Sequence, residues 1–367
     1  MQVNRGIKVP LYVQVYDSLY KIITEKNWQA EELLPSEREL STMFDVDRLT
    51  GRKALAMLAK EGLVEKIAGL GTRVKNVSLH LYDNSNYRNL LFLLPRVTNS
   101  IVSAQLITES FITNLFYRVE RECKKQGFNL VYTTISENEL LADVLKDRAI
   151  KGILFVSKVS EKFIYEAHKL KIPAVVVNNE SNCYPTIRAD REKGTYEAIK
   201  NLIDLNHRQI CFISGIVDYV TSKDSFHGFQ RALMDANIDW KQQIFKEGDW
   251  TFEGGFKAME EILKEQSPLP TAVFACNDMT AIGAMEAIKT AGLKIPQDIS
   301  VIGFDNIQQS KYCSPKLTTV GVNTSLMGKI ACEHLFMSLK NHEIHNIQII
   351  LPTELVLRES TAPRANQ

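Results

Sequence analysis

Short, continuous apolar runs separated by amphipathic stretches constrain the fold of this chain more than any other feature. A strand that is apolar at every position must be covered on both faces, and such strands belong to parallel sheets flanked by helices. These runs lie within residues 90–362. Such a region is long for one sheet, because single domains contain roughly 50–250 residues. We therefore predict an α/β fold with two similar lobes, whose strands include Leu90–Leu94, Gly152–Val156, Ala174–Val177, Ile210–Ile213, Ala272–Ala275 and Ser300–Gly303.

The first 77 residues have a different pattern. Apolar residues recur at helical spacing over residues 11–23. Ser36 and Glu39 form a capping box for a second helix, and Asp47 can cap a third. Two short extended runs then surround Gly69-Leu70-Gly71, which suits a tight hairpin. Three helices followed by a hairpin predict a winged helix-turn-helix, a small α+β domain.

These patterns predict a division of the chain into two domains. Residues 1–76 form the winged helix-turn-helix, residues 77–89 a polar linker, and residues 90–362 the two-lobed α/β domain. The linker is rich in turn-forming residues, with Asp83-Asn84-Ser85-Asn86 at its centre. In the large domain we expect the chain to cross between lobes near residues 190, 320 and 346.

Several stretches of the first domain carry a family resemblance. They occur in the same order as in the GntR-type transcription regulators, which this domain resembles. The resemblance implies a head that binds double-stranded DNA at an operator. The matching stretches are Pro10–Val15, Leu34–Leu40, Arg48–Leu55, Glu61–Leu63 and Gly69–Thr72.

The candidate DNA contacts lie on all three parts of the predicted motif. The first two turns of the third helix enter the major groove in such motifs. Arginine there can read guanine with two hydrogen bonds, whereas lysine and threonine mostly hold phosphates. Singly, each of these residues could be an ordinary solvated surface residue. The candidates are Arg38 on the second helix, Arg48, Thr50, Arg52 and Lys53 on the third, and Gly71, Thr72 and Arg73 in the wing.

Two residues depart from the family pattern. Asp47 stands where the family often has serine, and it places a negative charge near the DNA phosphates. Gly51 replaces a residue that is usually apolar, inside the predicted reading helix. A glycine within a helix costs about 1 kcal/mol relative to alanine.

The second domain resembles the effector domain of LacI/GalR-type regulators, which share the fold of periplasmic sugar-binding proteins. A GntR-type head joined to this receptor also resembles the arabinose-responsive repressors. The resemblance implies a homodimer that presents two heads to a roughly palindromic operator and a small-molecule effector that is bound between the lobes. The matching stretches are Asn206–Ile210, Phe274–Met279, Ile295–Asn306, Pro315–Val320 and Leu351–Thr361.

The candidate effector-binding residues follow the predicted strands. Ligands of open parallel sheets bind beyond the carboxyl ends of the strands. A sugar needs convergent polar groups and an aromatic face for the C–H side of its ring. An Asn or Asp after a strand is also commonly only a turn or cap, and a lone tryptophan is more often core. The candidates are Ser157, Asn178, Asn277, Asp278 and Asp305, with Trp250 at the family's stacking position.

One substitution bears on the identity of the effector. Many sugar-binding relatives carry an arginine where this chain has Ser225, so the strongest charged donor is missing from that segment. We expect an arabinose- or fucose-like monosaccharide. A purine, a sugar phosphate, a protein partner, and an effector-independent dimer remain alternatives.

Composition and motifs exclude several other classes. The chain has 44 Lys and Arg against 43 Asp and Glu, and residues 1–77 carry 12 against 10. The six cysteines have no C-x-x-C spacing, so we expect no metal site and no cofactor. No catalytic motif is present, and we expect a protein that is not an enzyme. Without an apolar signal segment or a run of about 18 apolar residues, we expect a cytoplasmic protein that does not cross a membrane.

Overall fold

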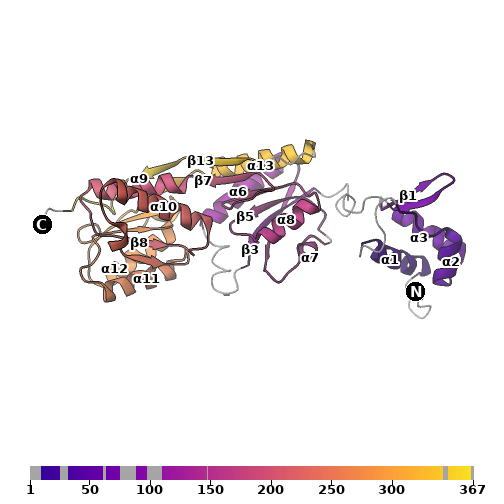
Figure 1. The fold of residues 1–367 in the computed structure, drawn as a ribbon, viewed down its shortest axis with the longest axis horizontal. Helices are drawn as coiled ribbons and strands as arrows, with labels where there is room; N and C mark the ends of the chain where they lie inside the picture. Colours follow the sequence, from indigo (N-terminus) through magenta and orange to yellow (C-terminus); the bar gives the residue numbers. More distant parts are fainter. Residues whose placement is uncertain are drawn as a thin grey trace. The chain divides into compact units, whose positions relative to one another are not determined.

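The computed structural model divides into two compact units (Figure 1). One unit comprises Met1–Asn89 together with Leu145–Lys151 and Lys169–Ile172, and the other comprises the remaining residues. The predicted linker lies outside the described residues as far as residue 87. The structure describes residues 10–24, 32–60, 63–74, 88–96, 110–146, 148–341 and 346–364.

The head contains three helices and a two-stranded hairpin, as the sequence predicts. The capping box is formed, because the Ser36 amide donates to Glu39 Oε2 at 2.7 Å and the Glu39 amide to Ser36 Oγ at 3.3 Å. Asp47 caps the third helix by accepting a hydrogen bond from the Thr50 amide at 2.8 Å. The elements are α1 (Leu11–Thr24), α2 (Glu37–Phe44), α3 (Arg48–Lys60), β1 (Val64–Ile67) and β2 (Gly71–Val74).

The inner faces of these elements form one small core. The apolar stripe of α1 is buried against α3, since the two helices are in contact. β1 and β2 pair antiparallel, and the turn between them places Gly69 and Gly71 at positive φ, 79° and 117°. Glycine adopts this backbone conformation without steric cost. The fully buried core residues include Val15, Leu19, Leu40, Phe44, Ala54, Leu58 and Val74.

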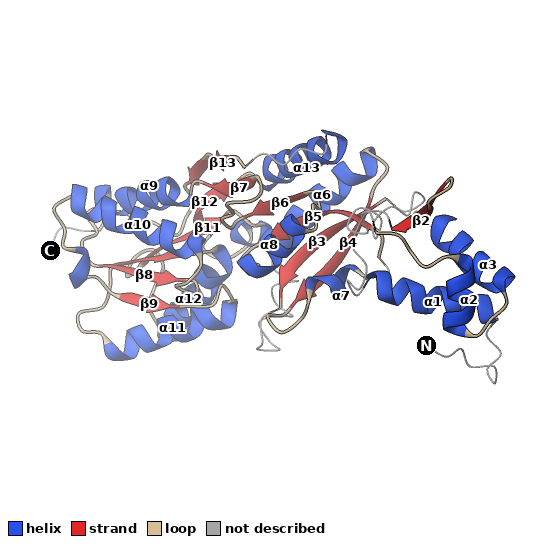
Figure 2. Ribbon diagram, turned by 45° about the vertical axis from the view of Figure 1, so that its right-hand side comes forward, coloured by secondary structure: helices blue, strands red, loops and turns tan. Residues whose placement is uncertain are grey.

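The receptor contains two six-stranded sheets, one for each lobe (Figure 2). The strand order is β13-β7-β6-β5-β3-β4 in the first lobe and β14-β12-β11-β10-β8-β9 in the second. Strand pairs such as β5–β6 and β8–β10 are parallel, whereas β12 and β14 pair antiparallel. The strands are β3 (Asn89–Pro95), β4 (Asn129–Ile135), β5 (Ile150–Val156), β6 (Ala174–Val177), β7 (Thr186–Ala189), β8 (Ile210–Ser214), β9 (Phe245–Glu247), β10 (Ala272–Ala275), β11 (Ser300–Asp305), β12 (Thr318–Val322), β13 (Gln348–Leu351) and β14 (Thr353–Val356).

Helices cover these sheets and account for the continuous apolar strands. Every residue of β6 and of β10 is buried, as the absence of alternation in these runs predicts. The helices are α6 (Ser110–Lys125), α7 (Leu141–Leu145), α8 (Glu161–Lys169), α9 (Arg191–Asp204), α10 (Val220–Asp235), α11 (Phe252–Glu265), α12 (Asp278–Thr290) and α13 (Thr324–Asn341), with short 3₁₀ helices η1 (Trp240–Gln242) and η2 (Gln308–Lys311).

The chain passes between the lobes at three places. The first is Asp190, between β7 and α9, and the second is Asn323, between β12 and α13. The third is Pro352, between β13 and β14, later than the position near residue 346 that the sequence suggests. The reason is that Gln348–Leu351 pairs with β7 and so extends the first sheet before the chain leaves it.

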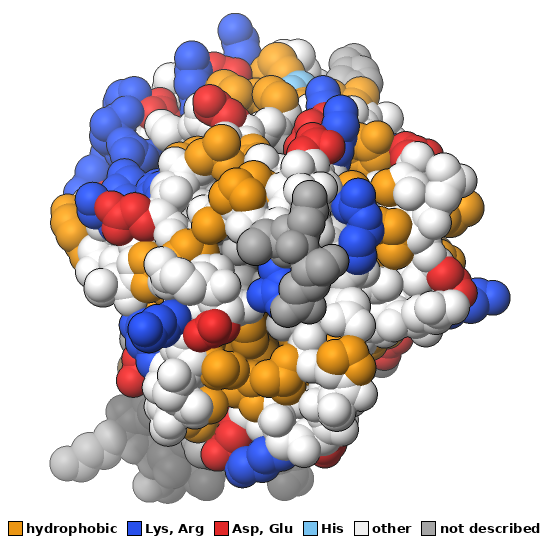
Figure 3. Space-filling model, turned by 90° about the vertical axis from the view of Figure 1, so that its left-hand side faces the viewer, with side chains coloured by type: hydrophobic (Ala, Val, Ile, Leu, Met, Phe, Trp, Pro, Cys, Tyr) orange, Lys and Arg blue, Asp and Glu red, His pale blue; other side chains and the backbone are white. Residues whose placement is uncertain are grey.

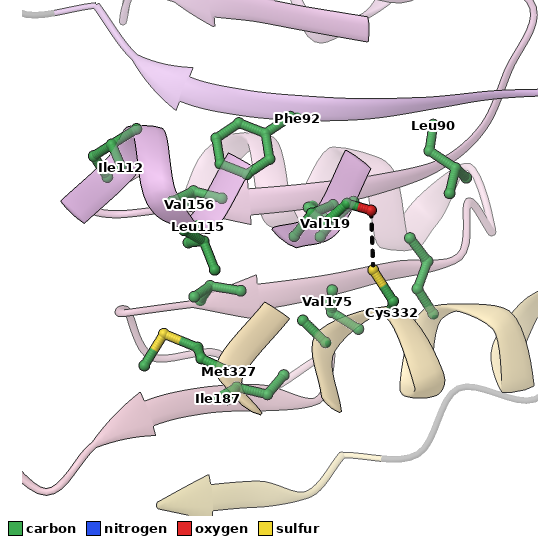
Figure 4. Close-up of a cluster of buried hydrophobic side chains, with 14 of the residues drawn as sticks. Leu90, Phe92, Ile112, Leu115, Val119, Val156, Val175, Ile187, Met327 and Cys332 are labelled. Carbon is green, nitrogen blue, oxygen red and sulfur yellow. Dashed lines mark hydrogen bonds between the residues drawn. The ribbon is translucent and has the colours of Figure 1, made fainter. Parts of the chain in front are cut away.

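The core of the first lobe joins segments that are far apart in sequence (Figure 4). α13 returns from the second lobe and packs on α6, burying Met327 and Cys332 beside Val119. The Cys332 thiol lies 3.8 Å from the Val119 carbonyl oxygen. The lobe is therefore completed only after most of the second lobe has been synthesised.

Candidate effector cleft and DNA-binding surface

The reading helix α3 exposes the cations that the sequence assigns to DNA. Arg48, Arg52 and Lys53 are exposed. Thr50 is half-buried, and its hydroxyl donates to Asp47 Oδ2 at 2.9 Å, so Asp47 fixes both the amide and the side chain of this residue. Thr50 therefore belongs to the N-terminal cap of α3. The three cations lie on the solvent-exposed side of the helix.

The exposed cations have only loose partners. The side chain of Arg52 is 67% exposed, and its Nε lies 4.0 Å from Glu37 Oε1. Lys53 lies over the ring of Tyr12, with 5.7 Å between Nζ and the ring centroid. Arg38, on α2, is also exposed. Pairs of this kind in water contribute about 0–1 kcal/mol, so these side chains can turn to a phosphate at little cost.

The wing is arranged differently. Gly71 is exposed and Thr72 is half-buried, with the Thr72 carbonyl accepting a hydrogen bond from the Leu34 amide at 2.7 Å. Arg73 pairs with Glu65 across the hairpin, with 3.0 Å between its Nε and Glu65 Oε1. Arg73 therefore carries a compensated charge, in contrast to Arg52.

Four of the six candidate effector residues line one cleft of the receptor. Ser157 and Asn178 follow strands of the first lobe, whereas Trp250 and Asp305 belong to the second. The cavity is narrow, about 50 Å³, which is space for one or two water molecules. Its lining is completed by Phe111, Ile112, Arg191, Tyr219 and Thr221.

These four residues also share an unusual backbone. Their φ angles are 63° at Ser157, 55° at Asn178, 64° at Trp250 and 103° at Asp305. Residues other than glycine rarely adopt positive φ, and strain of this kind is concentrated at functional sites. The fold maintains four strained residues around one small cavity.

A buried ion pair forms the charged part of the cleft. Arg191 Nη2 donates to Asp305 Oδ1 at 2.9 Å, and Nη1 donates to the carbonyl oxygen of Cys276 at 3.0 Å. The guanidinium lies over the ring of Phe304, 4.1 Å from its centroid. Burial raises the pKa of Asp305 to about 6, although the positive charge of Arg191 opposes the shift.

Arg191 is a cleft residue that the sequence reasoning missed. It is the first residue of α9, directly after the helix cap Asp190. The rule for strand ends does not include Arg191, because this residue enters the cleft from the start of a helix. A sequence signal existed, because an arginine at the first crossover between lobes must lie near the hinge.

The aromatic wall combines Trp250 and Tyr219. Their rings meet edge to face with 4.5 Å between centroids. Gly215 allows this arrangement, since a Cβ there would lie 2.2 Å from Trp250 Cε2. Asn277 Nδ2 donates to the Trp250 carbonyl oxygen at 2.9 Å and so holds the strained tryptophan backbone.

Asn277 and Asp278 do not line the cleft. Asn277 caps α12 by accepting from the Thr280 amide at 2.9 Å. The carboxylate of Asp278 accepts from the Ile307 amide at 2.8 Å and from the Thr319 hydroxyl. Burial and the nearby negative charge of Asp305 raise the pKa of Asp278 well above its ordinary value. Both side chains stabilise the second lobe, which agrees with the cap or turn alternative.

Polar atoms without partners lie in or near the cleft. Asn178 Oδ1 is buried and has no hydrogen-bond partner among the residues that the structure describes. The hydroxyls of Ser222 and Ser225, on the first turns of α10, are also buried and unpartnered. A buried polar atom without a partner costs about 1–3 kcal/mol, and such atoms often await a ligand or a water molecule.

Two contacts join the lobes beside the cleft. Arg188 on β7 pairs with Asp224 on α10, with 3.0 Å between Nη1 and Oδ2. Lys158, after β5, lies over the ring of Tyr219, 5.1 Å from its centroid. These contacts connect a strand end of the first lobe to the start of α10 in the second lobe.

The described residues contain no group of three or more His, Cys, Asp or Glu that could hold a metal ion. Within the same residues, no helix combines the length and the apolar character that a membrane crossing requires. His207 is buried and lies between the hydroxyl of Thr271 and the carbonyl oxygen of Ala362, at 3.0 and 3.1 Å. It therefore fixes the C-terminal segment by packing and hydrogen bonding.

Comparisons with known proteins identify both domains. The model of the bacterial regulatory proteins, gntR family, matches residues 11–74, and that of the periplasmic binding protein-like domain matches residues 199–361. The HTH-type transcriptional repressor PurR of Aliivibrio fischeri is 34% identical over 271 residues, covering 71% of this chain and 80% of the relative. The chain belongs to the LacI family of transcription regulators.

Further relatives agree with a LacI-family receptor. The ribose operon repressor of Haemophilus influenzae is 32% identical over 257 residues, covering 68% of this chain and 77% of the relative. A LacI family transcriptional regulator from Enterococcus faecium, solved with bound ribose, has a TM-score of 0.68 at 26% identity, covering 75% of this chain and 99% of that one. The protein is a DNA-binding transcription repressor and not an enzyme, as the sequence predicts.

Proposed function

We propose that this LacI-family protein is a repressor released from its operator by a neutral monosaccharide, arabinose- or fucose-like in size. The observation that carries the proposal is the buried pair Arg191–Asp305 in the same small cavity as the unpartnered Asn178 oxygen. Sugar hydroxyls both donate and accept hydrogen bonds, so they can bind a guanidinium, a carboxylate and an amide together.

The charges of the cleft favour a neutral ligand. Arg191 and Asp305 are the charged residues of the lining, and their charges cancel. A sugar phosphate needs a site with a net positive charge. We therefore consider it a less suitable effector than a neutral sugar. The ribose named for two relatives supports a ligand of pentose size.

Aromatic and strained residues complete the proposed site. Trp250 and Tyr219 supply the apolar wall for the C–H face of a sugar ring. The positive-φ backbones of Ser157 and Asn178 aim strand ends of the first lobe at the same cavity. Because ligand pockets typically measure roughly 300–1,000 Å³ and this cavity measures about 50 Å³, the lobes must open to admit the sugar and close around it.

For the head, we propose that α3 enters the major groove of the operator. Arg48 and Arg52 read base edges, Lys53 and Arg38 contact phosphates, and the turn at Gly71 brings the wing backbone close to the DNA. Thr50 and Arg73 contribute less, because their side chains already have partners. A homodimer would present two such heads to a palindromic operator. Figure 3 shows one face of the molecule, on which Lys and Arg side chains, gathered at the upper left and scattered elsewhere, lie among Asp, Glu and apolar side chains.

The proposal requires coupling between the two sites. If the sugar weakens DNA binding, DNA must weaken sugar binding by the same factor. A thermal-shift screen of the full chain against arabinose, fucose, ribose, sugar phosphates and purines tests the ligand class first. A rise in melting temperature with one monosaccharide, followed by release of the operator at the same concentration, supports the proposal. A response to a purine or a sugar phosphate alone, or to none of these compounds, overturns it.

A further inference from the structure

The cleft contains one guanidinium, and its hydrogen-bonding capacity is only partly used. Arg191 has five N–H donors. One bonds Asp305 and one bonds the Cys276 carbonyl, which leaves three without a partner among the described residues. The side chain is 9% exposed, and it lines the cavity.

The surroundings of Arg191 hold its guanidinium in one position. Phe304 packs on its face and Asp305 fixes one edge. On the neighbouring helix α10, Ser225 is fully buried. One turn further, a Cβ at Gly228 would lie 2.2 Å from the carbonyl oxygen of Glu192, so α9 and α10 cross closely here. This crossing leaves little room for a second long cation beside Arg191.

We propose that Arg191 is the residue that selects the effector, by donating two parallel hydrogen bonds to adjacent hydroxyls of the sugar. The inference rests on the proposed function and names its ligand more closely, as a sugar with a free vicinal diol. A planar guanidinium can match two neighbouring oxygens at once, whereas an ammonium acts as a point charge.

The position of Arg191 also gives the ligand direct access to the hinge. The preceding residue, Asp190, is the first crossover, and its amide donates to the Leu351 carbonyl at 2.8 Å. The hydroxyl of Thr353 donates to the Asp190 carbonyl at 3.1 Å, so this contact includes the third crossover as well. A sugar held by Arg191 is thus one residue away from two of the three segments that join the lobes.

The test uses Arg191→Lys in the full chain, with Arg188→Lys as the matched control. Arg188 is also a well-buried arginine in an ion pair, but it does not line the cleft. The probe is whichever of ribose, arabinose and fucose binds the wild type best, together with its monodeoxy analogues. We expect Arg191→Lys to weaken sugar binding at least tenfold and to bind the parent sugar and the deoxy analogues almost equally. Arg188→Lys should keep the wild-type preference.

The outcomes separate the two proposals. If the wild type binds none of these sugars, the proposed function fails and the inference fails with it. If the wild type binds a sugar and Arg191→Lys retains the same preference over the deoxy analogues, only the inference is overturned. Should Arg191→Lys not fold, the neutral double variant Arg191→Gln/Asp305→Asn replaces it, with the same loss of preference expected.

Discussion

The head and the receptor use arginine in opposite ways. In the head, Arg52 is two-thirds exposed and its nearest carboxylate oxygen is 4.0 Å away. In the receptor, Arg191 is 9% exposed and bonded to Asp305 at 2.9 Å. A charge destined for DNA must remain hydrated and adaptable, because the polyanion supplies its partner. A charge destined for a small neutral ligand must be fixed beforehand, because the ligand brings too few contacts to order it.

Removing one carboxylate from each region tests this contrast most strongly. Asp305→Ala should destabilise the receptor by about 3–5 kcal/mol, because it leaves the Arg191 charge buried without its partner. The matched change in the head, Glu65→Ala, should cost about 1 kcal/mol or less, since the pair with Arg73 is partly exposed. Urea denaturation of the full chain, followed by circular dichroism, measures both. Equal losses of stability would refute the contrast.

For operator binding, we expect the larger effect from the exposed arginine of the head and the smaller effect from the paired one. Arg52→Ala should reduce operator affinity by about 1–3 kcal/mol, roughly 5- to 150-fold, because an exposed arginine of α3 would lose its contact with a base. Arg73→Ala should reduce it several-fold less, because Glu65 already compensates its charge. Fluorescence anisotropy with a labelled operator at fixed salt measures both variants. Sugar binding should be unchanged in each, and a larger effect of Arg73 than of Arg52 would contradict the assignment.

Between pH 5 and 7, sugar binding by the receptor should depend on pH, whereas operator binding by the head should not. The pKa of Asp305 is raised to about 6, so its carboxylate becomes protonated below that pH. If a sugar hydroxyl donates to this carboxylate, affinity should fall roughly tenfold for each pH unit below 6. Operator binding is the internal control, since arginine and lysine keep their charge over this range. Titration calorimetry at pH 5, 6 and 7 measures the slope, and a flat profile would remove Asp305 from the site.

The same group affects stability with the opposite sign. Its pKa in the folded protein lies above the ordinary value of 3.8, so the folded state binds the proton more tightly than the unfolded state. The contribution of Asp305 to stability therefore decreases as pH rises from about 4 to 6. As pH rises from about 4 to 6, the stability of the receptor without sugar should therefore decrease, whereas its affinity for the sugar should increase.

More of the structure of the head than of the receptor cleft could be predicted from the sequence, and the reason is physical. Capping boxes, helical stripes and glycine turns are local signals, so the order of elements in the head could be derived before the structure was known. The rule for strand ends selected Ser157, Asn178 and Asp305, and these three residues line one cavity. It could not separate them from Asn277 and Asp278, because a strand-end side chain that caps a helix and one that faces a cavity have the same local sequence pattern.

Arg191 and the third crossover show where local reasoning ends. The location of Arg191 in the cleft depends on the packing of α9 against β11, since its partners Cys276 and Asp305 are distant in sequence. The crossover at Pro352 depends on the pairing of β13 with β7. Both are long-range contacts that no window along the chain contains.

The smallest expected effect concerns Gly51, where the head departs from its family. Gly51 is buried on the side of α3 that faces α2, and a Cβ there would lie 3.7 Å from both the Glu37 carbonyl oxygen and Leu40 Cβ. This is ordinary van der Waals contact, so Gly51→Ala should stabilise α3 by about 1 kcal/mol. Amide hydrogen exchange in α3 should then slow roughly fivefold, a factor that corresponds to this energy at 25 °C. Operator affinity should not decrease, because the added methyl points away from the exposed face that carries Arg48 and Arg52. Faster exchange, or weaker operator binding with unchanged exchange, would show instead that the reading helix needs the flexibility of glycine.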